Sequence, residues 1–101
     1  MNYKEIQDKY INAGVKNYKF SDAAQVKAVL GYDFRTMRGF KNLSDKSKIL
    51  AEKLICKYLN GWGLETRESI RPMSIKREKG RFVVKFKNKS FCYLYYDGTV
   101  G

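Results

Sequence analysis

Apolar residues recur three and four positions apart through the first two-thirds of the chain, a spacing that predicts helices. Three helices are expected, over residues 2–12, 21–31 and 44–60. Each begins at residues suited to cap a helix and is followed by a glycine that favours a stop. The third has the widest apolar face. The side chains of the first helix expected to face the core are Tyr3, Ile6, Tyr10 and Ala13.

The segment 32–42 is compatible with either a further short helix or an irregular loop. Apolar residues recur in it every three positions, and basic residues follow each of them by one position. The apolar set is Phe34, Met37 and Phe40, and the basic set is Arg35, Arg38 and Lys41. As a helix, this segment would have an apolar edge beside a basic edge.

Strict alternation of apolar and polar residues predicts strands in the last third. The first is expected near 73–78, because Pro72 limits it to an edge or a late start. Lys79-Gly80 suits a tight turn before a strand over 81–87. Residues 88–90 suit a second turn, and a third strand is expected over 91–96.

Helices that precede strands favour an α+β fold over repeated βαβ units. We expect one domain, residues 1–101, with a helical part over about 1–62 and a β-meander over about 68–98. Three or four N-terminal helices would pack on one face of a C-terminal three-stranded antiparallel sheet.

The charge balance changes the functional picture. Lys and Arg number 21 against 10 Asp and Glu, a net charge of +11. Such a chain attracts nucleic acid, an anionic membrane surface or an acidic protein, although a basic surface also serves solubility alone. No apolar run is long enough for a membrane span or a signal peptide, so a cytoplasmic protein is expected, without membrane partners.

Residue types that are missing exclude several kinds of chemistry. The chain has no histidine and only two cysteines, Cys56 and Cys92. A four-ligand Cys/His zinc site and a Ser-His-Asp arrangement are therefore excluded within one chain. The two cysteines are expected to be buried free thiols that act as small hydrophobic residues. We expect no metal, no cofactor and no enzymatic activity.

A first candidate site is the outer side of the sheet. If Phe82, Val84 and Phe86 face the helices, the basic residues of the same strand face out. Phe91, Tyr93 and Tyr95 share that side if Cys92, Leu94 and Tyr96 belong to the core. Lysines hold phosphates and aromatic rings stack on bases, although solubilising lysines and packed tyrosine pairs fit the same pattern. The candidate binding residues are Lys76, Arg77, Lys79, Arg81, Lys85, Lys87, Lys89, Tyr93 and Tyr95.

A second candidate lies in residues 21–42. Apolar and turn residues there fall at the positions of a helix-turn-helix, namely Val26, Leu30, Gly31, Tyr32, Met37 and Phe40. The segment resembles that motif of DNA-binding proteins, except that Lys27 stands where the motif has a small residue. The resemblance implies that Arg35, Thr36, Arg38 and Lys41 lie on or near a recognition helix, with the Lys79-Gly80 hairpin as a basic wing. A plain helical hairpin with solvated arginines is the alternative.

The function expected from these patterns is a non-catalytic nucleic-acid-binding module, with DNA or RNA, sequence preference and oligomeric state left open. One alternative is a small phage or mobile-element inhibitor that blocks a host nucleic-acid machine, such as a CRISPR or restriction effector, through an acidic surface. Another is a ribonuclease, since the composition is similar to that of small basic toxins of toxin–antitoxin pairs that cut RNA without histidine. Its candidate residues would be Arg77, Arg81, Lys85 and Tyr95.

Overall fold

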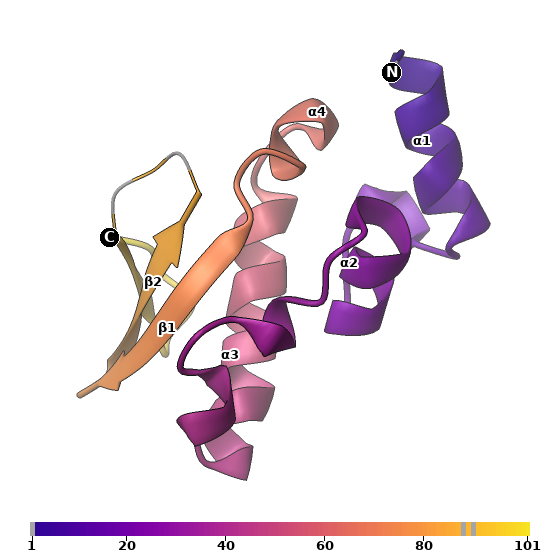
Figure 1. Ribbon diagram of the computed structural model, residues 1–101. Helices are drawn as coiled ribbons and strands as arrows, with labels where there is room; N and C mark the ends of the chain where they lie inside the picture. The colour runs from indigo at the N-terminus through magenta and orange to yellow at the C-terminus, as the bar shows by residue number, and fades with distance from the viewer. Residues whose placement is uncertain (1, 88, 90) are drawn as a thin grey trace.

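In the residues that the structure describes, the chain forms four α-helices followed by a three-stranded sheet, which confirms the expected α+β class (Figure 1). The computed structural model describes residues 2–87, 89 and 91–101. Its helices are α1 (Tyr3–Asn12), α2 (Ala23–Leu30), α3 (Asp45–Asn60) and α4 (Leu64–Arg67). Its strands are β1 (Pro72–Glu78), β2 (Arg81–Phe86) and β3 (Phe91–Tyr95). Three one-turn 3-10 helices are η1 (Lys16–Tyr18), η2 (Phe34–Thr36) and η3 (Phe40–Asn42).

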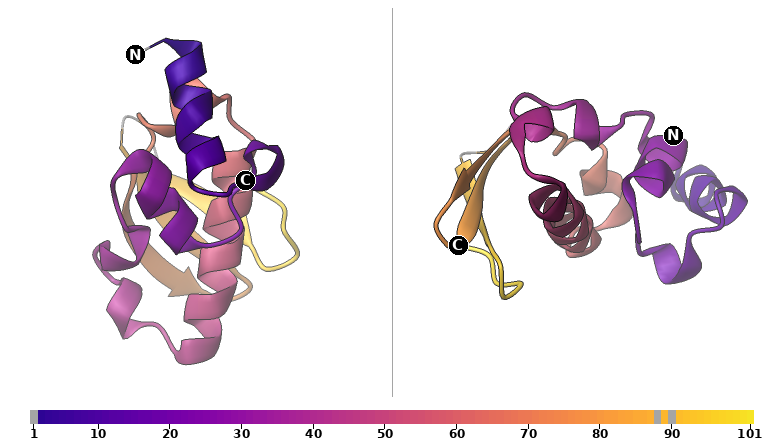
Figure 2. Two further views of the ribbon diagram at one scale, coloured as in Figure 1. Left: turned by 90° about the vertical axis from the view of Figure 1, so that its right-hand side faces the viewer. Right: turned by 90° about the horizontal axis from the view of Figure 1, so that it is seen from below.

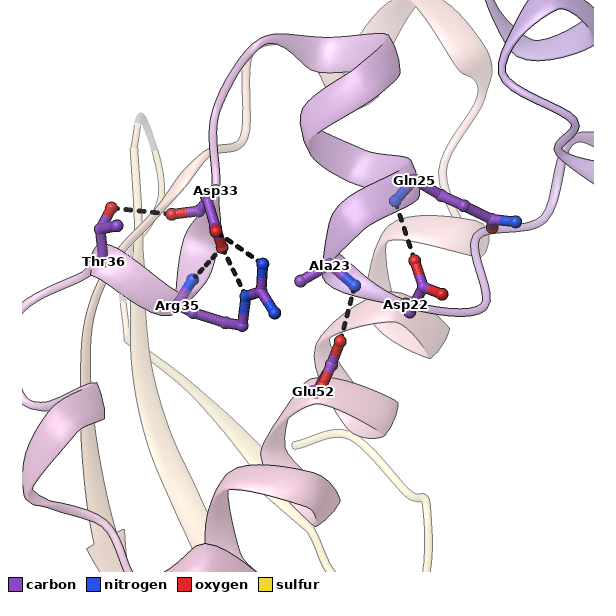
Figure 3. Close-up of polar contacts among 7 residues, drawn as sticks. All are labelled: Asp22, Ala23, Gln25, Asp33, Arg35, Thr36 and Glu52. Atoms are coloured by element: carbon purple, nitrogen blue, oxygen red, sulfur yellow. Dashed lines mark hydrogen bonds and ion pairs between the residues drawn. The ribbon is translucent and has the colours of Figure 1, made fainter.

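Side chains cap the three longer helices as their sequences predict. Asn2, Asp22 and Ser44 each accept a hydrogen bond from the backbone N–H three residues later. The Glu52 side chain of α3 also accepts a bond of 2.7 Å from the backbone N–H of Ala23, which fastens the start of α2 to α3 (Figure 3). These bonds satisfy N–H groups that have no partner inside their own helix.

The placement of Tyr3 in the core is wrong, because this side chain is 51% exposed. Tyr10 is fully buried, whereas Ile6 and Ala13 are only partly buried. The first turn of α1 projects beyond the other elements (Figure 2), which agrees with the exposure of Tyr3.

The segment between α2 and α3 is not a helix, so the helix-turn-helix prediction is wrong. Only the single turns η2 and η3 form; between them Met37 is extended and Arg38 forms a β-bridge. Asp33 accepts hydrogen bonds from the backbone N–H and side chain of Arg35, which closes η2 locally (Figure 3). Gly39 then takes a left-handed φ of +92°, which an α-helix does not allow. No recognition helix is present here to carry Arg35, Thr36, Arg38 and Lys41.

The extended residue in this segment pairs with the sheet. Arg38 donates its backbone N–H to Met73 and accepts one from Ile75, at 3.3 and 2.9 Å. This forms a parallel bridge between Arg38 and Ser74 at the edge of β1. At the other edge, β3 exchanges backbone hydrogen bonds with residues 99–101. Both edges of the sheet are therefore paired over part of their length.

The strands run antiparallel in the order β1-β2-β3. Phe82, Val84 and Phe86 of β2 are fully buried, as the alternation predicts. The strand bounds agree with the expected ones to within one residue. The expected turn over 88–90 includes Asn88 and Ser90, which lie outside the described residues.

The molecule is layered, with the sheet on one side, α3 in the middle, and α1 and α2 beyond α3 (Figure 2, right). The ring of Tyr58 in α3 stacks on Phe86 with centroids 4.4 Å apart, and its hydroxyl lies 3.4 Å from the Cys92 sulfur. All four α-helices lie on the same side of the sheet, so among the described residues no helix covers its other face. None of the helices in this part of the chain has the length and apolar character needed to span a membrane.

The short helix α4 was not expected, and it places Arg67 in the interior. This arginine is 4% exposed. Its guanidinium donates to the carbonyl oxygens of Trp62, Tyr18 and Asn60, at 2.9, 2.5 and 3.2 Å. Three separate segments of the chain are thus joined through one side chain.

Candidate functional site

The candidate site is the face of the sheet turned away from α3, called here the outer face. The pairing of the strands brings its residues together in three rows that run across the sheet. The rows are Ser74–Lys85–Phe91, Lys76–Val83–Tyr93 and Glu78–Arg81–Tyr95. The strand period predicts this grouping for β2 and β3, and the buried Leu94 on the opposite side of β3 agrees with it.

Arg38 extends the first row by one residue. Residues paired in a β-bridge lie on the same side of the sheet, so the bridge to Ser74 places Arg38 on the outer face. The row then reads Arg38–Ser74–Lys85–Phe91, with one cation on each side of a small serine. The two candidate sites expected from the sequence thus meet at this residue.

One corner of the outer face is electrically balanced. The Arg81 Nε donates to Oε1 of Glu78 at 2.8 Å, and Nη1 of Arg81 donates to the Tyr95 hydroxyl at 3.3 Å. These hydrogen bonds raise the pKa of Arg81 above its usual value. The guanidinium also lies 4.0 Å from the ring centroid of Tyr93. Arg81 is therefore fixed against an aromatic ring and has a carboxylate beside it.

The rest of the outer face is positive. In the described part of the chain the ion pairs are Arg35–Asp33 and Arg81–Glu78, so neither Arg38, Lys76 nor Lys85 has a carboxylate partner there. The ammonium of Lys85 donates to the backbone carbonyl of Lys89. It lies 5.9 Å from the ring centroid of Phe91.

Phe91 has the most exposed aromatic side chain of the described part of the outer face, at 61%. Tyr93 and Tyr95, which the sequence favoured for stacking, are partly buried and lie against Arg81. The sequence analysis expects Phe91 on this face but does not include it among the binding residues. The alternation along β3 could have identified it, since Phe91 shares the strand period of both tyrosines.

Other expected binding residues lie beside the outer face or away from it. Arg77 pairs with the buried Phe82, and its Nε donates to the Tyr96 hydroxyl at 3.0 Å on the helix side. The ammonium of Lys89 lies 4.2 Å from the ring centroid of Trp62, which also belongs to the helical part. Residues that border the outer face are Lys79 in the first hairpin turn and Lys87 just after β2, both exposed.

Two basic residues of the segment between α2 and α3 are also exposed but do not join the three rows. Arg35 is held by Asp33 at 2.8 Å, which lowers the pKa of that carboxyl (Figure 3). Lys41 lies in η3. Of the basic set expected on a recognition helix, the structure therefore brings only Arg38 to the outer face.

An apolar pocket lies between α3 and the turn after β3. It has a volume of about 240 Å³ and is lined by Leu54, Lys57, Tyr58, Gly61, Trp62, Leu94, Gly98, Thr99 and Val100. The Lys57 ammonium donates to the carbonyl of Gly98 at its rim. Burial and the Cys92 hydrogen bond raise the pKa of Tyr58 to about 12. This tyrosine is therefore protonated near neutral pH.

Both cysteines are free thiols, as expected, but only Cys56 is buried, whereas Cys92 is partly buried. Burial raises the pKa of Cys56 to about 12, so the thiol is not a nucleophile near neutral pH. No group of three or more Cys, Asp or Glu residues that could hold a metal ion occurs within residues 2–87, 89 and 91–101. The outer face therefore has the arrangement best suited to bind a ligand, namely cations beside aromatic rings.

The chain matches no protein-family model, no curated protein sequence and no solved structure. A functional assignment therefore depends on the geometry and charge of the outer face.

Proposed function

We propose that the protein binds nucleic acid through the outer face, without catalysing a reaction, in the cytoplasm. The observation that supports this most is the grouping of Arg38, Lys76 and Lys85 on a face over which no described helix lies. In the described chain these cations have no carboxylate partners, and the exposed ring of Phe91 lies on the same face.

Phosphates are the natural partners of such cations. Lysine and arginine side chains neutralise phosphates and release the counterions around them, which makes binding sensitive to salt. Lys79 and Lys87 border the outer face at different places and extend its positive charge. With about four phosphates neutralised, the log–log slope of affinity against salt is expected near −3 to −4.

The aromatic rings of the outer face add stacking on bases, which a purely basic surface cannot provide. Base–aromatic stacking contributes about 1–3 kcal/mol per base and tolerates any sequence, because every base has a π-face. The outer face offers Phe91 and the Arg81–Tyr93 stack within the same three rows as the lysines. Its chemistry therefore suits both the phosphate and the base of a nucleotide.

Replacing Lys76 and Lys85 together with alanine is expected to weaken nucleic-acid binding about tenfold or more and to make the salt slope shallower by about two. Each lysine removed takes away one phosphate contact. The measurement is fluorescence anisotropy of labelled oligonucleotides at several salt concentrations. The matched control is Lys4→Ala/Lys9→Ala on α1, which removes the same charge at the far end of the molecule from the sheet (Figure 1).

Equal losses in the two double variants would contradict the proposal, because net charge alone would then account for binding. So would an absence of binding to every nucleic acid at physiological salt. In that second case the remaining candidate ligand of the outer face is a protein partner with an acidic groove, as expected for an inhibitor of a nucleic-acid machine.

A further inference from the structure

Phe91, Tyr93 and Tyr95 follow one another along β3, each two residues after the last, on the outer face. Alternate residues of a strand lie about 6.5–7 Å apart. Neighbouring bases in a nucleic-acid helix are only about 3.4 Å apart. Stacking positions at the strand spacing therefore match bases that have been drawn apart.

Phe91 and Lys85 form the first nucleotide-sized unit. They are directly paired across β2 and β3, and the Lys85 ammonium lies 5.9 Å from the Phe91 centroid. Phe91 is 61% exposed, so its ring is accessible to a base. The ammonium is close enough to take the phosphate of the same or the next nucleotide.

Arg81 and Tyr93 form a second stacking position. The Arg81 guanidinium lies 4.0 Å from the ring centroid of Tyr93, and Glu78 holds it there through Nε and Nη2, both at 2.8 Å. A guanidinium plane accepts a base in the way an aromatic ring does. Lys76 shares the row of Tyr93, which provides a second cation beside this position.

Duplex nucleic acid suits this geometry poorly. Proteins that read a duplex usually place a helix or a two-stranded ribbon in its major groove. The described segment beside the sheet forms only the single turns η2 and η3, and the first hairpin turn has two residues. In a duplex the faces of the bases are stacked on each other, so no base face is free to stack on an aromatic ring of the protein.

From these contacts we infer that the ligand of the outer face is a single-stranded polynucleotide. One base lies on Phe91 and a neighbouring base on the Arg81–Tyr93 stack, while Arg38, Lys76 and Lys85 hold the phosphates. This inference rests on the proposed function and names the class of ligand for the same site. RNA and single-stranded DNA share this chemistry, and the experiment separates them.

The test compares oligonucleotides of about ten nucleotides, within the site sizes known for single-strand binders. Four are used, namely single-stranded RNA, single-stranded DNA, the matching DNA duplex and an abasic DNA strand with the same phosphates. The protein is expected to bind at least one natural single strand about tenfold or more tighter than the duplex and the abasic strand. The tighter of RNA and DNA identifies the source of the ligand.

Phe91→Ala is expected to weaken binding of the natural single strand about five- to 100-fold and to leave the abasic strand unchanged. Phe91→Tyr keeps a ring at this position and should retain most of the affinity. The matched control is Ile49→Ala on α3, which removes an apolar side chain that is 71% exposed and lies away from the sheet's outer face. This control should bind as the unaltered protein does.

Two results would overturn the inference, an abasic strand bound as tightly as the natural strand or a duplex bound more tightly than either single strand. If Lys76→Ala/Lys85→Ala still weakens binding in that case, the proposed function stands and only the ligand class is wrong. If the lysine and Phe91 variants all bind like the unaltered protein, both proposals fail.

Discussion

Replacing Arg67 with alanine is expected to destabilise the fold by about 3–5 kcal/mol, a large share of the 5–15 kcal/mol typical of such a domain. The guanidinium is buried and donates to three backbone carbonyls, in η1, at the end of α3 and in the connector to α4. It also lies 5.6 Å from the ring centroid of Tyr10 and 5.4 Å from that of Phe20. Alanine leaves these carbonyls without donors and a void beside both rings.

Thermal unfolding followed by circular dichroism measures this effect, and a fall in Tm of roughly 15–30 °C is expected for a chain of this size. The control is Arg71→Ala, whose exposed guanidinium lies 5.0 Å from the ring centroid of Tyr32. Losing that single exposed contact is expected to cost about 1 kcal/mol or less. A loss at Arg67 no larger than at Arg71 would show that the buried hydrogen bonds are not what joins the three segments.

Replacing Gly39 with alanine is expected to destabilise the protein by about 2–5 kcal/mol. Its φ of +92° is unfavourable for any residue with a Cβ. A Cβ at this position would also overlap the backbone carbonyl oxygen of Ile75, which belongs to β1 and cannot easily move. Urea denaturation measures the loss of unfolding free energy.

Gly31→Ala is the matched control for Gly39→Ala. Gly31 has a similar φ of +82°, but a Cβ there meets nothing within 4 Å, so only the backbone cost of about 1–2 kcal/mol is expected. The difference between the two variants isolates the close approach of Gly39 to β1. Since that approach keeps Arg38 on the outer face, Gly39→Ala should also weaken nucleic-acid binding more than Gly31→Ala. Equal unfolding free energies for the two variants would contradict the close packing of this segment on β1.

The elements that the sequence predicts well are those whose causes are local. The caps at Asn2, Asp22 and Ser44 act within three residues, so they mark the helix starts in the chain itself. Pro72 and the pair Lys79-Gly80 likewise fix the limits of β1 and β2 to within one residue.

What the sequence does not show depends on partners far along the chain. Phe34, Met37 and Phe40 are all buried, as their spacing favours, yet the chain between them does not form a continuous helix. The reason is the pairing of Arg38 with β1, which no local pattern contains. In the sequence Arg67 is only one more basic residue. The carbonyl oxygens that accept its hydrogen bonds lie in η1 and at the end of α3, outside its local sequence.

The candidate site, too, is predictable where local patterns determine it and not where pairing with a distant segment does. The alternation of Phe82, Val84 and Phe86 indicates which side of β2 faces out, and β3 follows from it. β1 has no such clear alternation, and its register shifts between Pro72 and Ser74. Which of its basic residues join the outer face therefore depends on strand pairing, and the sequence could not separate Lys76 from Arg77.

Binding of nucleic acid at the outer face of the sheet is tested most directly by titrating the ¹⁵N-labelled protein with a single-stranded oligonucleotide and following its amides by NMR. The largest amide shifts are expected at Lys76, Lys85 and Phe91 and at Arg38 beside them, while α1 stays unchanged. Largest shifts on the exposed side of α3, around Lys53, with β1–β3 unchanged, would contradict it.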